Sequence, residues 1–317
     1  MRVLHVDTAL ELRGGQRQLA YLLAGRPDDA WAGVPGSPLA GLVGPPAVPL
    51  HPGADPRNAL RLRRAAAEYD LVAAHTPHAH GIALFVGRPL VVHRRVDFVP
   101  RHPLKYRPVA AVVAVSEAVA GILRAAGVER VTVVHDGVAA PRPEAPLHID
   151  APRPFWGAAG ALVPHKGHLH LVEAMAHTPG TLLVAGEGPL RASLEARAAA
   201  LDLRGRVRFL GALPTLGAFF ATLDAFVHPS VEEGLGQVVL EAMAAGCRVV
   251  TTTAGGLSEI VGSAGVLVPP GDAAALSVGM RAALGRPLGE GIARAGEFSI
   301  GRMVEGTSAV YSAVVGG

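Results

Sequence analysis

Short apolar runs alternate with amphipathic stretches along nearly the whole chain of 317 residues. The runs at 3–6 (VLHV) and 70–75 (DLVAAH) are apolar on both faces, which is typical of buried strands in a parallel sheet. An amphipathic stretch begins after Ser116 and ends at Gly127, and both residues are suited to cap a helix. Further strands are predicted at 89–93, 110–116 and 130–135, and a Gly14-Gly15 turn precedes a predicted helix over 16–24. The first half of the chain therefore predicts an α/β domain with a parallel sheet.

A proline-rich segment interrupts this alternation, with five prolines from Pro141 to Pro154. Proline fixes φ and lacks an N–H donor, so this segment continues neither a helix nor a sheet, and we expect the linker there. The alternation then restarts, with predicted strands at 154–160, 181–189, 206–211, 224–230, 248–253 and 265–270 and predicted helices over 168–176, 190–200 and 237–245.

The whole pattern predicts an α/β protein with two Rossmann-like domains that face each other across a cleft. The expected bounds are 1–145 for the first domain and 146–297 for the second, and a final helix over 298–317 is expected to pack back on the first. Ligands of such sheets bind at the carboxyl ends of the strands, which is where the polar residues discussed below fall.

Composition narrows the class of protein. Half of the residues are hydrophobic and 17% are charged, which allows a large core and excludes a disordered chain. The single cysteine, Cys247, excludes an internal disulfide and disfavours a cysteine-based metal site. The N-terminus lacks the apolar core of a signal peptide, and no apolar run is long enough to span a membrane. We therefore expect a cytoplasmic protein.

The net charge of +3 gives no overall attraction for nucleic acid, but basic residues cluster in the first half. One cluster lies on a predicted helix and the other in a loop-rich stretch; they comprise Arg57, Arg61, Arg63 and Arg64, and Arg94, Arg95, Arg101, Lys105 and Arg107. Two interpretations are open. The clusters form a solvated face, or they bind an anionic acceptor and hold the protein peripherally at the inner face of the membrane.

The stretch HPSVEEGLGQVVLEAMAAG, at 228–246, places carboxylates in a segment that otherwise resembles core. Glu241 lies on a helix that is apolar nearly all round, and a buried carboxylate is costly unless something satisfies it. Its partner is either a structural cation or a pair of ligand hydroxyls. Glu233 stands just before the helix, beside Gly234-Leu235-Gly236, where backbone N–H groups and the helix dipole favour an anion.

Glu233 and Glu241, with seven residues between them, resemble the E-x7-E signature of retaining GT-B glycosyltransferases of family 4. The resemblance extends through the C-terminal half in the family's order, through Lys166-Gly167, GEGPLRASLE, RVRFLG, TTTAGGLSEIV and GVLVPPGD. The N-terminal half matches more loosely, through the Gly14-Gly15 turn, AVSEAV and VVHDGV. The resemblance implies a GT-B fold in which the C-terminal domain holds a nucleotide-sugar donor and the N-terminal domain presents the acceptor.

The resemblance also implies a role for each charged residue. Glu241 would bind the ribose hydroxyls of the donor. Glu233 would hold hydroxyls of the transferred sugar near its anomeric carbon, whereas Glu232 lies off the spacing and is expected to be solvated. Lys166 would neutralise the diphosphate leaving group, which is the main electrostatic demand of the reaction.

Backbone groups complete the implied donor site. The N–H groups of Gly15, Leu235 and Gly236 would approach the diphosphate, and the base would lie near Gly211–Pro214. The implied donor-binding residues are Gly15, Lys166, Gly186, Gly211, Leu213, Glu233, Gly234, Leu235, Gly236 and Glu241. The implied catalytic residues are Glu233, Lys166, His78 and Arg95.

The chain departs from the family pattern at two sites. Ala161 stands where an arginine usually pairs with the lysine, so either His165 or Arg191 compensates or the leaving group is less well stabilised. The acidic residue that usually follows the DGV-type turn is missing, because Ala139 and Ala140 follow instead. The N-terminal domain is also short for the family, which is consistent with a trimmed acceptor domain.

Histidines and arginines supply the N-terminal candidates. His75, His78 and His80 follow a strand, and their spacing on a loop is weakly specific for a metal, so we expect contacts to donor or acceptor hydroxyls. Arg95 occupies the slot in which the family has a histidine, with His93 two positions earlier. The chain has no Asp-x-Asp motif, which favours chemistry that needs neither a metal ion nor a cofactor besides the donor.

The sequence thus predicts a retaining transfer of sugar from a nucleotide-diphosphate donor to the hydroxyl of a glycan, a lipid-linked acceptor or a small molecule. The donor phosphate would take up the acceptor's proton. One alternative is a non-catalytic nucleotide-sugar binder. A nicotinamide-dependent Rossmann enzyme is disfavoured, because TALELRGGQRQLA does not supply G-x-G-x-x-G after the first strand.

Overall fold

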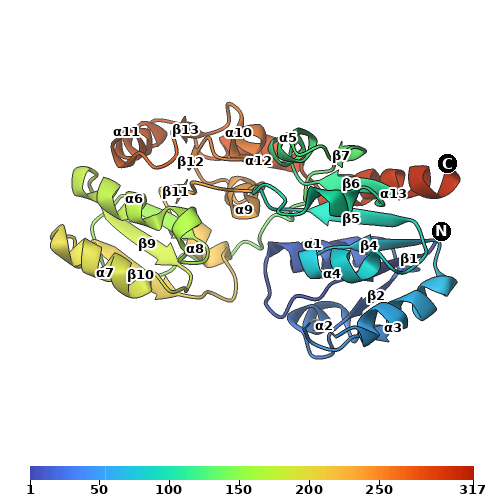
Figure 1. Cartoon of the computed structure of the whole chain (residues 1–317). Coiled ribbons are helices and arrows are strands. Elements are labelled where there is room, and N and C mark those ends of the chain that lie inside the picture. The colour runs from blue at the N-terminus through green and yellow to red at the C-terminus, as the bar shows by residue number, and fades with distance from the viewer. Residues whose placement is uncertain (54) are drawn as a thin grey trace. The chain divides into compact units, whose positions relative to one another are not determined.

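The computed structural model describes residues 1–53 and 55–317, which divide into two compact units. The N-terminal unit comprises Met1–Gly137 and Ser299–Gly317, and the C-terminal unit comprises Val138–Phe298. Each unit is one parallel sheet covered by helices, so the predicted α/β class is confirmed (Figure 1).

The N-terminal unit has a seven-stranded sheet in the order β3-β2-β1-β4-β5-β6-β7. Its strands are β1 (Val3–Val6), β2 (Ala30–Gly33), β3 (Val48–Pro49), β4 (Leu71–Ala74), β5 (Leu90–Arg94), β6 (Ala111–Ala114) and β7 (Val131–Val133). Neighbouring strands of this sheet pair in parallel, and β1 lies between β2 and β4. The strand order therefore reverses between β1 and β4, which is where such sheets bind ligands.

Helices cover both faces of this sheet. They are α1 (Gly14–Gly25), α2 (Pro38–Val43), α3 (Arg57–Ala65), α4 (Pro77–Ala83), α5 (Glu117–Ala125) and α13 (Ile300–Gly316), with 3-10 turns at Ala66–Glu68 and Pro103–Tyr106. The last helix, α13, packs against α1 and β6 (Figure 1). Its Val310 and Tyr311 join alternate residues of the central strands, among them Val3, Ala73 and Val91, in one buried cluster.

The C-terminal unit has a six-stranded parallel sheet in the order β10-β9-β8-β11-β12-β13. Its strands are β8 (Phe155–Ala159), β9 (Thr181–Ala185), β10 (Val207–Gly211), β11 (Ala225–His228), β12 (Val249–Thr252) and β13 (Val266–Val268). Its helices are α6 (His168–Ala174), α7 (Arg191–Ala200), α8 (Gly217–Thr222), α9 (Gln237–Ala244), α10 (Leu257–Val261), α11 (Ala273–Ala283) and α12 (Glu290–Gly296), with 3-10 turns at Pro164–Lys166 and Met175–His177. The strand order reverses between β8 and β11, and the core centres on the fully buried Trp156.

The structure differs from the predicted elements in the N-terminal unit. The sequence pattern does not predict β2 (AWAG) and β3 (VP), because alanine, glycine and proline are uncommon in strands. The helix α1 begins at Gly14, so the two glycines form its first turn instead of a turn before it. The side chain of Gln16 accepts a hydrogen bond from the N–H of Arg13, which starts the helix at that point.

The proline-rich segment contains neither helix nor strand. It runs along α8, because Glu144 accepts hydrogen bonds from Thr215 and from the N–H of Ala218, and the hydroxyl of Thr222 accepts the N–H of Leu147. The chain passes between the units ahead of this segment, at Gly137 and Val138, and again at Phe298 and Ser299.

Among the described residues, no helix combines the length and the apolar character that crossing a membrane would need.

Replacing Tyr311 with alanine should lower the unfolding free energy of the N-terminal unit by about 3–5 kcal/mol, because a fully buried aromatic ring is removed from the cluster under α13. Chemical denaturation followed by circular dichroism measures this. The matched control is Val315→Ala on the same helix, where the side chain is 41% exposed and the expected change is within about 0.5 kcal/mol. Equal effects of the two changes would show that α13 does not complete this core.

Candidate functional site

The loops that follow β8 and β11 meet at the strand-order reversal of the C-terminal unit. The loop after β8 carries Lys166 and the loop after β11 carries Glu233. The N–H of Val231 donates to the carbonyl of His165 at 2.8 Å. Gly167 has φ +67°, and a Cβ there would lie 2.0 Å from the carbonyl oxygen of Pro229. The glycine of the Lys-Gly pair is therefore required for the close approach of the two loops.

This approach surrounds one oxygen of Glu233 with donors. Its Oε2 lies 2.5 Å from Lys166 Nζ, 2.8 Å from His228 Nε2 and 3.3 Å from Ser230 Oγ. The Glu233 side chain is 13% exposed and that of Lys166 is 21% exposed. Among the residues that the structure describes, no side chain or backbone group donates a hydrogen bond to the other oxygen of Glu233, Oε1.

The surroundings keep Glu233 ionised. Burial opposes ionisation, but the hydrogen bond from His228 and the ammonium of Lys166 outweigh it and hold the pKa of Glu233 well below its ordinary value. Burial lowers the pKa of His228 more than Glu233 raises it, so this imidazole is neutral and donates its Nε2–H to the carboxylate. The result is a fixed anion with a cation and neutral donors on one side.

The TTTAGG motif holds the backbone of the same loop. The N–H of Gly256 donates to the carbonyl of Glu233 at 3.3 Å. Gly255 has φ +51°, and a Cβ there would lie only 1.6 Å from that carbonyl oxygen. The second glycine that the loop needs is Gly236, which has φ +100° and precedes the first turn of α9. Gly234 and Leu235, which lie between Glu233 and Gly236, are buried.

Helix α9 is not buried all round, so that prediction is wrong. Val239 and Leu240 are fully buried, as are Ala242 and Met243, but Glu241 is only half-buried. It lies one turn after the half-buried Gln237, so the two polar residues share the outer side of the helix. The sequence pattern did not reveal this outer side, because the alanine and valine residues around Glu241 are also compatible with partial exposure.

Three glycines line the carboxyl ends of the other strands. The N–H of Gly160, after β8, donates to Ala185, and the N–H of Gly186, after β9, donates to Gly211 at the end of β10. A Cβ on Gly186 would lie 1.9 Å from the carbonyl oxygen of Gly160. The half-buried Leu213 follows Gly211 in the next loop. The implied base-binding residues thus share the edge of the sheet that carries Lys166 and Glu233.

Of the two candidates that could replace the missing arginine, one is exposed and the other is already paired with carboxylates. Ala161 is exposed, and so is His165. The guanidinium of Arg191 is paired with Glu187 at 2.7 Å and with Glu195 at 3.0 Å. Arg191 therefore belongs to a surface ion-pair group beside Gly211, and its charge is already matched by two carboxylates.

Sequence reasoning missed three polar residues around Lys166. His228 and Ser230 are buried and contact Glu233 directly. His168 is 4% exposed, and burial together with the nearby His228 and Lys166 lowers its pKa to about 4, so it is neutral. Two of the three lie in the HPS motif before the acidic pair, where a histidine that ends a buried strand was the available signal.

In the N-terminal unit the corresponding edge carries Gly15 and Arg95. A Cβ on Gly15 would lie 3.7 Å from Arg95 Cδ. Arg95 follows β5, and its Nε donates to Asp136 Oδ1 at 2.9 Å while its Nη1 donates to His75 Nδ1 at 3.3 Å. His93, two residues earlier, is buried and hydrogen-bonded to the Tyr311 hydroxyl at 2.7 Å.

The three histidines of HTPHAHG do not converge, and the predicted loop is the helix α4. Thr76 caps this helix by accepting the N–H of Ala79, which sends the histidine side chains in different directions. His75 contacts Arg95, whereas His80 is hydrogen-bonded to the carbonyl of Lys105 at 3.2 Å. His78 lies on α4, and its Nε2 is buried. No group of metal-ligating side chains is found among residues 1–53 and 55–317.

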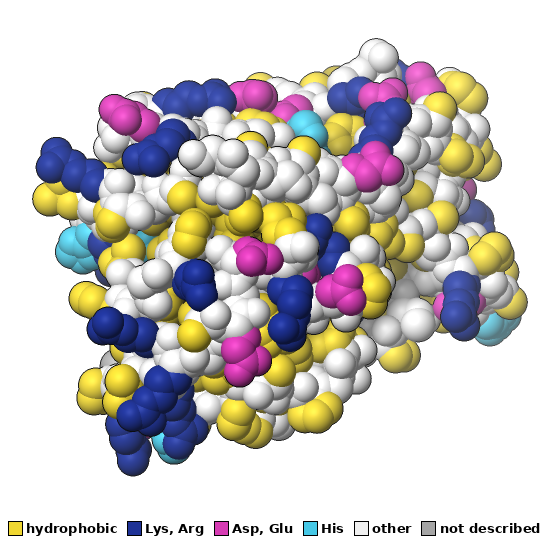
Figure 2. Space-filling model, turned by 90° about the vertical axis from the view of Figure 1, so that its right-hand side faces the viewer, with side chains coloured by type: hydrophobic (Ala, Val, Ile, Leu, Met, Phe, Trp, Pro, Cys, Tyr) yellow, Lys and Arg dark blue, Asp and Glu magenta, His cyan; other side chains and the backbone are white. Residues whose placement is uncertain are grey.

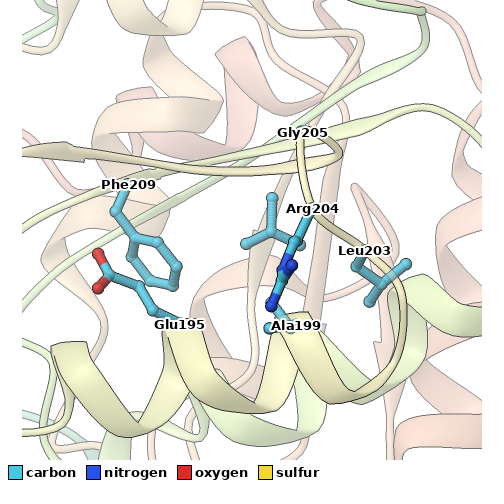
Figure 3. A pocket seen from close by; sticks show the side chains of 8 residues that line it. Glu195, Ala199, Leu203, Arg204, Gly205 and Phe209 are labelled. Carbon is cyan, nitrogen blue, oxygen red and sulfur yellow. The ribbon is translucent and has the colours of Figure 1, made fainter.

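A shallow hollow in the C-terminal unit contains none of the predicted site residues (Figure 3). Leu203, Arg204 and Gly205 line it beside the start of β10, and Glu195 and Phe209 flank it. It lies mainly at the amino end of that strand, away from the edge that carries Glu233.

Glu233→Gln should remove an acid-dependent part of the stability. The folded pKa of Glu233 is depressed, so its contribution is complete above the ordinary value of 4.5 and is lost as the pH falls towards the folded pKa. The difference in unfolding free energy between wild type and variant should be constant above about pH 6 and shrink below about pH 4.5, by up to about 1.4 kcal/mol per pH unit. Urea unfolding across this range measures it. The control is Glu232→Gln at the exposed neighbour, and a pH-independent difference for Glu233→Gln would contradict the assigned ionisation.

Solved structures and curated relatives were compared with the chain. The crystal structure of Anabaena Alr3699/HepE in complex with UDP superposes with a TM-score of 0.85 at 21% identity, over 99% of this chain and 100% of that one. The same protein in complex with UDP-glucose gives a TM-score of 0.84 at 22% identity, with the same shares of both chains. This similarity confirms the predicted GT-B fold.

Curated relatives match parts of their own length. The 2-deoxystreptamine glucosyltransferase of Streptomyces kanamyceticus is 32% identical over 241 residues, which are 67% of this chain and 62% of the relative. The lipopolysaccharide core biosynthesis glycosyltransferase LpsE of Rhizobium meliloti is 39% identical over 132 residues, 41% of this chain and 39% of the relative. The chain thus covers less than two thirds of the length of each.

Two family models match the chain in succession. The model described as Glycosyltransferase Family 4 matches residues 19–142, and the one described as Glycosyl transferases group 1 matches residues 153–286. Together the two matches cover most of the chain, which therefore belongs to glycosyltransferase family 4.

Proposed function

We propose that the chain is a retaining glycosyltransferase that moves a sugar from a nucleotide-diphosphate sugar to an acceptor hydroxyl without a metal ion. The observation that carries this proposal is the carboxylate of Glu233. Its Oε2 is fixed by Lys166, His228 and Ser230, while Oε1 has no recorded donor among the described residues. An ionised oxygen held in this way is suited to accept hydrogen bonds from the hydroxyls of the transferred sugar.

The diphosphate would find its positive partners at the same edge. Lys166 is partly exposed, and a diphosphate beside it would share its ammonium with Glu233. In the first turn of α9 the N–H groups of Val239 and Leu240 donate to the carbonyl of Gly236, and the helix dipole favours an anion at this end. These groups would stabilise the leaving group electrostatically, with no requirement for a metal ion.

The nucleoside would lie along the glycine-lined edge. Gly186 and Gly211 leave room for a base next to the backbone, and Leu213 offers it an apolar contact. Glu241, on the partly exposed side of α9, would accept the two ribose hydroxyls. UDP-glucose is the first donor to test, because the Anabaena protein of the same fold is solved in complex with it.

Arg95 is the stronger of the two catalytic candidates in the N-terminal unit. It lies beside Gly15 at the carboxyl edge of its sheet, whereas the Nε2 of His78 is buried on α4. We assign to Arg95 the place that a histidine occupies in the family. The acceptor's proton would pass to the departing phosphate, so the reaction requires no strong base from the protein.

The acceptor is proposed to be a glycan, carried by a lipid or free, and bound by the N-terminal unit. Two of the basic residues predicted to form a surface are turned inward: Arg94 is buried against Phe98, and Arg95 is paired with Asp136. The segment between them and β6 exposes apolar side chains next to two exposed arginines; these residues are Phe98, Val99, Arg101, Leu104 and Arg107. Such a mixture fits peripheral contact with an anionic membrane that carries the acceptor.

The arginines of α3 support the membrane proposal less. Arg57, Arg61, Arg63 and Arg64 are exposed, and Arg57 is paired with Asp55. On the face drawn in Figure 2, acidic side chains lie among the basic ones, and only one dense group of Lys and Arg stands at its lower left. A solvated helix accounts for this distribution without a partner.

A matching donor should raise the melting temperature of the purified protein in the absence of metal. At one hundred times its dissociation constant, a ligand that binds only the folded state adds about 2.7 kcal/mol to the unfolding free energy. UDP, GDP, ADP and their sugar conjugates are compared by scanning fluorimetry with EDTA present. We expect one diphosphate series to stand out, with UDP first. No shift with any of them would overturn the proposal, and a shift that requires a divalent ion would overturn its metal-independent part.

Glu233→Ala should lower kcat on the order of a hundredfold or more while the nucleotide affinity changes little, because the carboxylate acts on the transferred sugar. Glu241→Ala should weaken nucleotide binding roughly tenfold or more, because a charged acceptor of the ribose hydroxyls is lost. Calorimetry with the nucleotide and steady-state transfer rates separate the two effects.

Glu232→Ala is the matched control, since this neighbour is exposed, and neither quantity should change. Equal losses of nucleotide binding and turnover in both variants would contradict the separate roles assigned to Glu233 and Glu241. Nucleotide binding by the wild type without transfer to any acceptor would favour the non-catalytic alternative.

A further inference from the structure

A continuous line of hydrogen-bonded side chains runs through the N-terminal unit. Asp136 Oδ1 accepts from Arg95 Nε at 2.9 Å, and Arg95 Nη1 contacts His75 Nδ1 at 3.3 Å. His75 Nε2 lies 2.9 Å from His5 Nδ1, and His5 Nε2 lies 3.1 Å from Asp29 Oδ2. The line connects Arg95, at the end of β5, with Asp29, just before the start of β2.

The sheet itself brings these residues into line. In the register of the strands, Val3 lies opposite Leu71 and His5 opposite Ala73. Side chains two residues apart share a face, so His75 and Arg95 continue the rows that begin with Ala73 and Val91. Those rows face α13, because Val3, Ala73 and Val91 belong to the cluster with Tyr311. His5 thus takes the place of an apolar side chain in the core, and the half-buried His75 continues the same face towards Arg95.

The direction of every hydrogen bond in this line follows from Arg95. A guanidinium has no acceptor, so His75 Nδ1 must accept, and His75 carries its proton on Nε2. His75 then donates to His5 Nδ1, which leaves the proton of His5 on Nε2, where it donates to Asp29. Both rings are therefore neutral and in the same tautomer. If His75 were cationic, its Nδ1 would carry a proton and could not accept a hydrogen bond from the guanidinium of Arg95.

The surroundings favour this state. His5 is fully buried, and the pKa values of both His5 and His75 are lowered, with burial as the largest cause. His93 stacks on the ring of His75 at 4.4 Å and is itself held by the Tyr311 hydroxyl. A buried polar network of this kind is stable only when its members are satisfied, and satisfied networks hold their members rigidly.

The far end of the line is anchored at the opposite edge of the sheet. Asp29 also accepts the N–H of Val3 at 2.9 Å and pairs with Arg26 at 2.5 Å. A small surface hollow opens there, lined by Arg26, Asp28, Asp29 and Ser308 among others. Burial alone would raise the pKa of Asp29, but the hydrogen bonds from His5 and Arg26 lower it, so the anchor is an anion.

We propose that His75 is a positioning residue: its Nδ1 accepts from the guanidinium of Arg95 and fixes it at the carboxyl edge of the N-terminal sheet, while His5 and Asp29 hold His75 in the tautomer that can accept. The guanidinium of Arg95 already pairs with Asp136, so a carboxylate in the place of His75 would put a second negative charge beside it. An imidazole acceptor orients the guanidinium without adding that charge. This inference rests on the proposed function, in which Arg95 is a catalytic residue.

Two substitutions of His75 each keep one of its two hydrogen-bond contacts and remove the other. Glutamine places an amide near the position of Nε2, so His75→Gln keeps the contact to His5 and loses the one to Arg95. Asparagine places an oxygen near Nδ1, so His75→Asn keeps the acceptor for Arg95 and loses the contact to His5. A role in packing alone would make the two variants similar. Asn58→Ala is the control, since Asn58 is fully buried in the same unit and its two hydrogen bonds go to the backbone of His51.

The first readout needs no activity. In ¹⁵N spectra at neutral pH, both His5 and His75 should be neutral with the proton on Nε2. The guanidinium nitrogens of Arg95 should give separate signals in wild type, in His75→Asn and in Asn58→Ala, and should average in His75→Gln. A cationic ring, the other tautomer in either histidine, or averaged Arg95 signals in wild type would overturn the proposal.

The second readout is transfer. We expect His75→Gln to lower kcat on the order of tenfold or more with little change in KM for the donor, and His75→Asn and Asn58→Ala to stay within about threefold of wild type. Equal losses of kcat in the two His75 variants would overturn the positioning role. If wild type transfers no sugar although the spectra show the expected tautomers, the proposed function fails and the arrangement around Arg95 stands.

Discussion

An ionised carboxylate that is mostly buried must be matched by donors, and the C-terminal unit is built around this requirement at Glu233. Lys166 lies in the loop after β8 and His228 is the last residue of β11, and they reach one oxygen only because β8 and β11 are neighbours at the reversal of strand order. The close contact of the two loops depends in turn on Gly167, and the backbone of Glu233 depends on Gly255. Several motifs that are separate in the sequence are therefore parts of a single arrangement.

The N-terminal unit also holds a charged group by hydrogen bonds at the carboxyl edge of its sheet. There too the strand order reverses beside the first strand. Gly15 lies in the first turn of α1, which follows β1, and His75 and Arg95 lie directly after β4 and β5. The fixed charge is a cation instead of an anion, and its neighbours are imidazoles and Asp136. In both units a charged group is held at the carboxyl edge by neutral histidine, which orients it without cancelling it.

Sequence patterns were sufficient for the fold class and for most long elements, because buried parallel strands and capped helices leave strong local signals. They were insufficient for β2 and β3, which consist largely of alanine, glycine and proline, residues that are uncommon in strands. Motif spacing placed Lys166 and Glu233 in the candidate site, but it did not predict the partners His228 and Ser230, which depend on how two loops meet. It also gave the wrong burial for Glu241, which is half-buried, and a loop where the histidines lie on the helix α4. Composition alone does not fix which side of a helix faces outward.

The C-terminal helix has a consequence for synthesis of the chain on the ribosome. The N-terminal unit is discontinuous, and its core includes Val310 and Tyr311 of α13, whereas the C-terminal unit is one continuous segment. At roughly 5–20 residues per second, translation of the intervening segment takes on the order of ten seconds or more. During that interval the first unit to emerge exposes the apolar sheet face that α13 covers. All residues of the second unit are synthesised before α13, so the first unit can complete its core only after the second unit has been made.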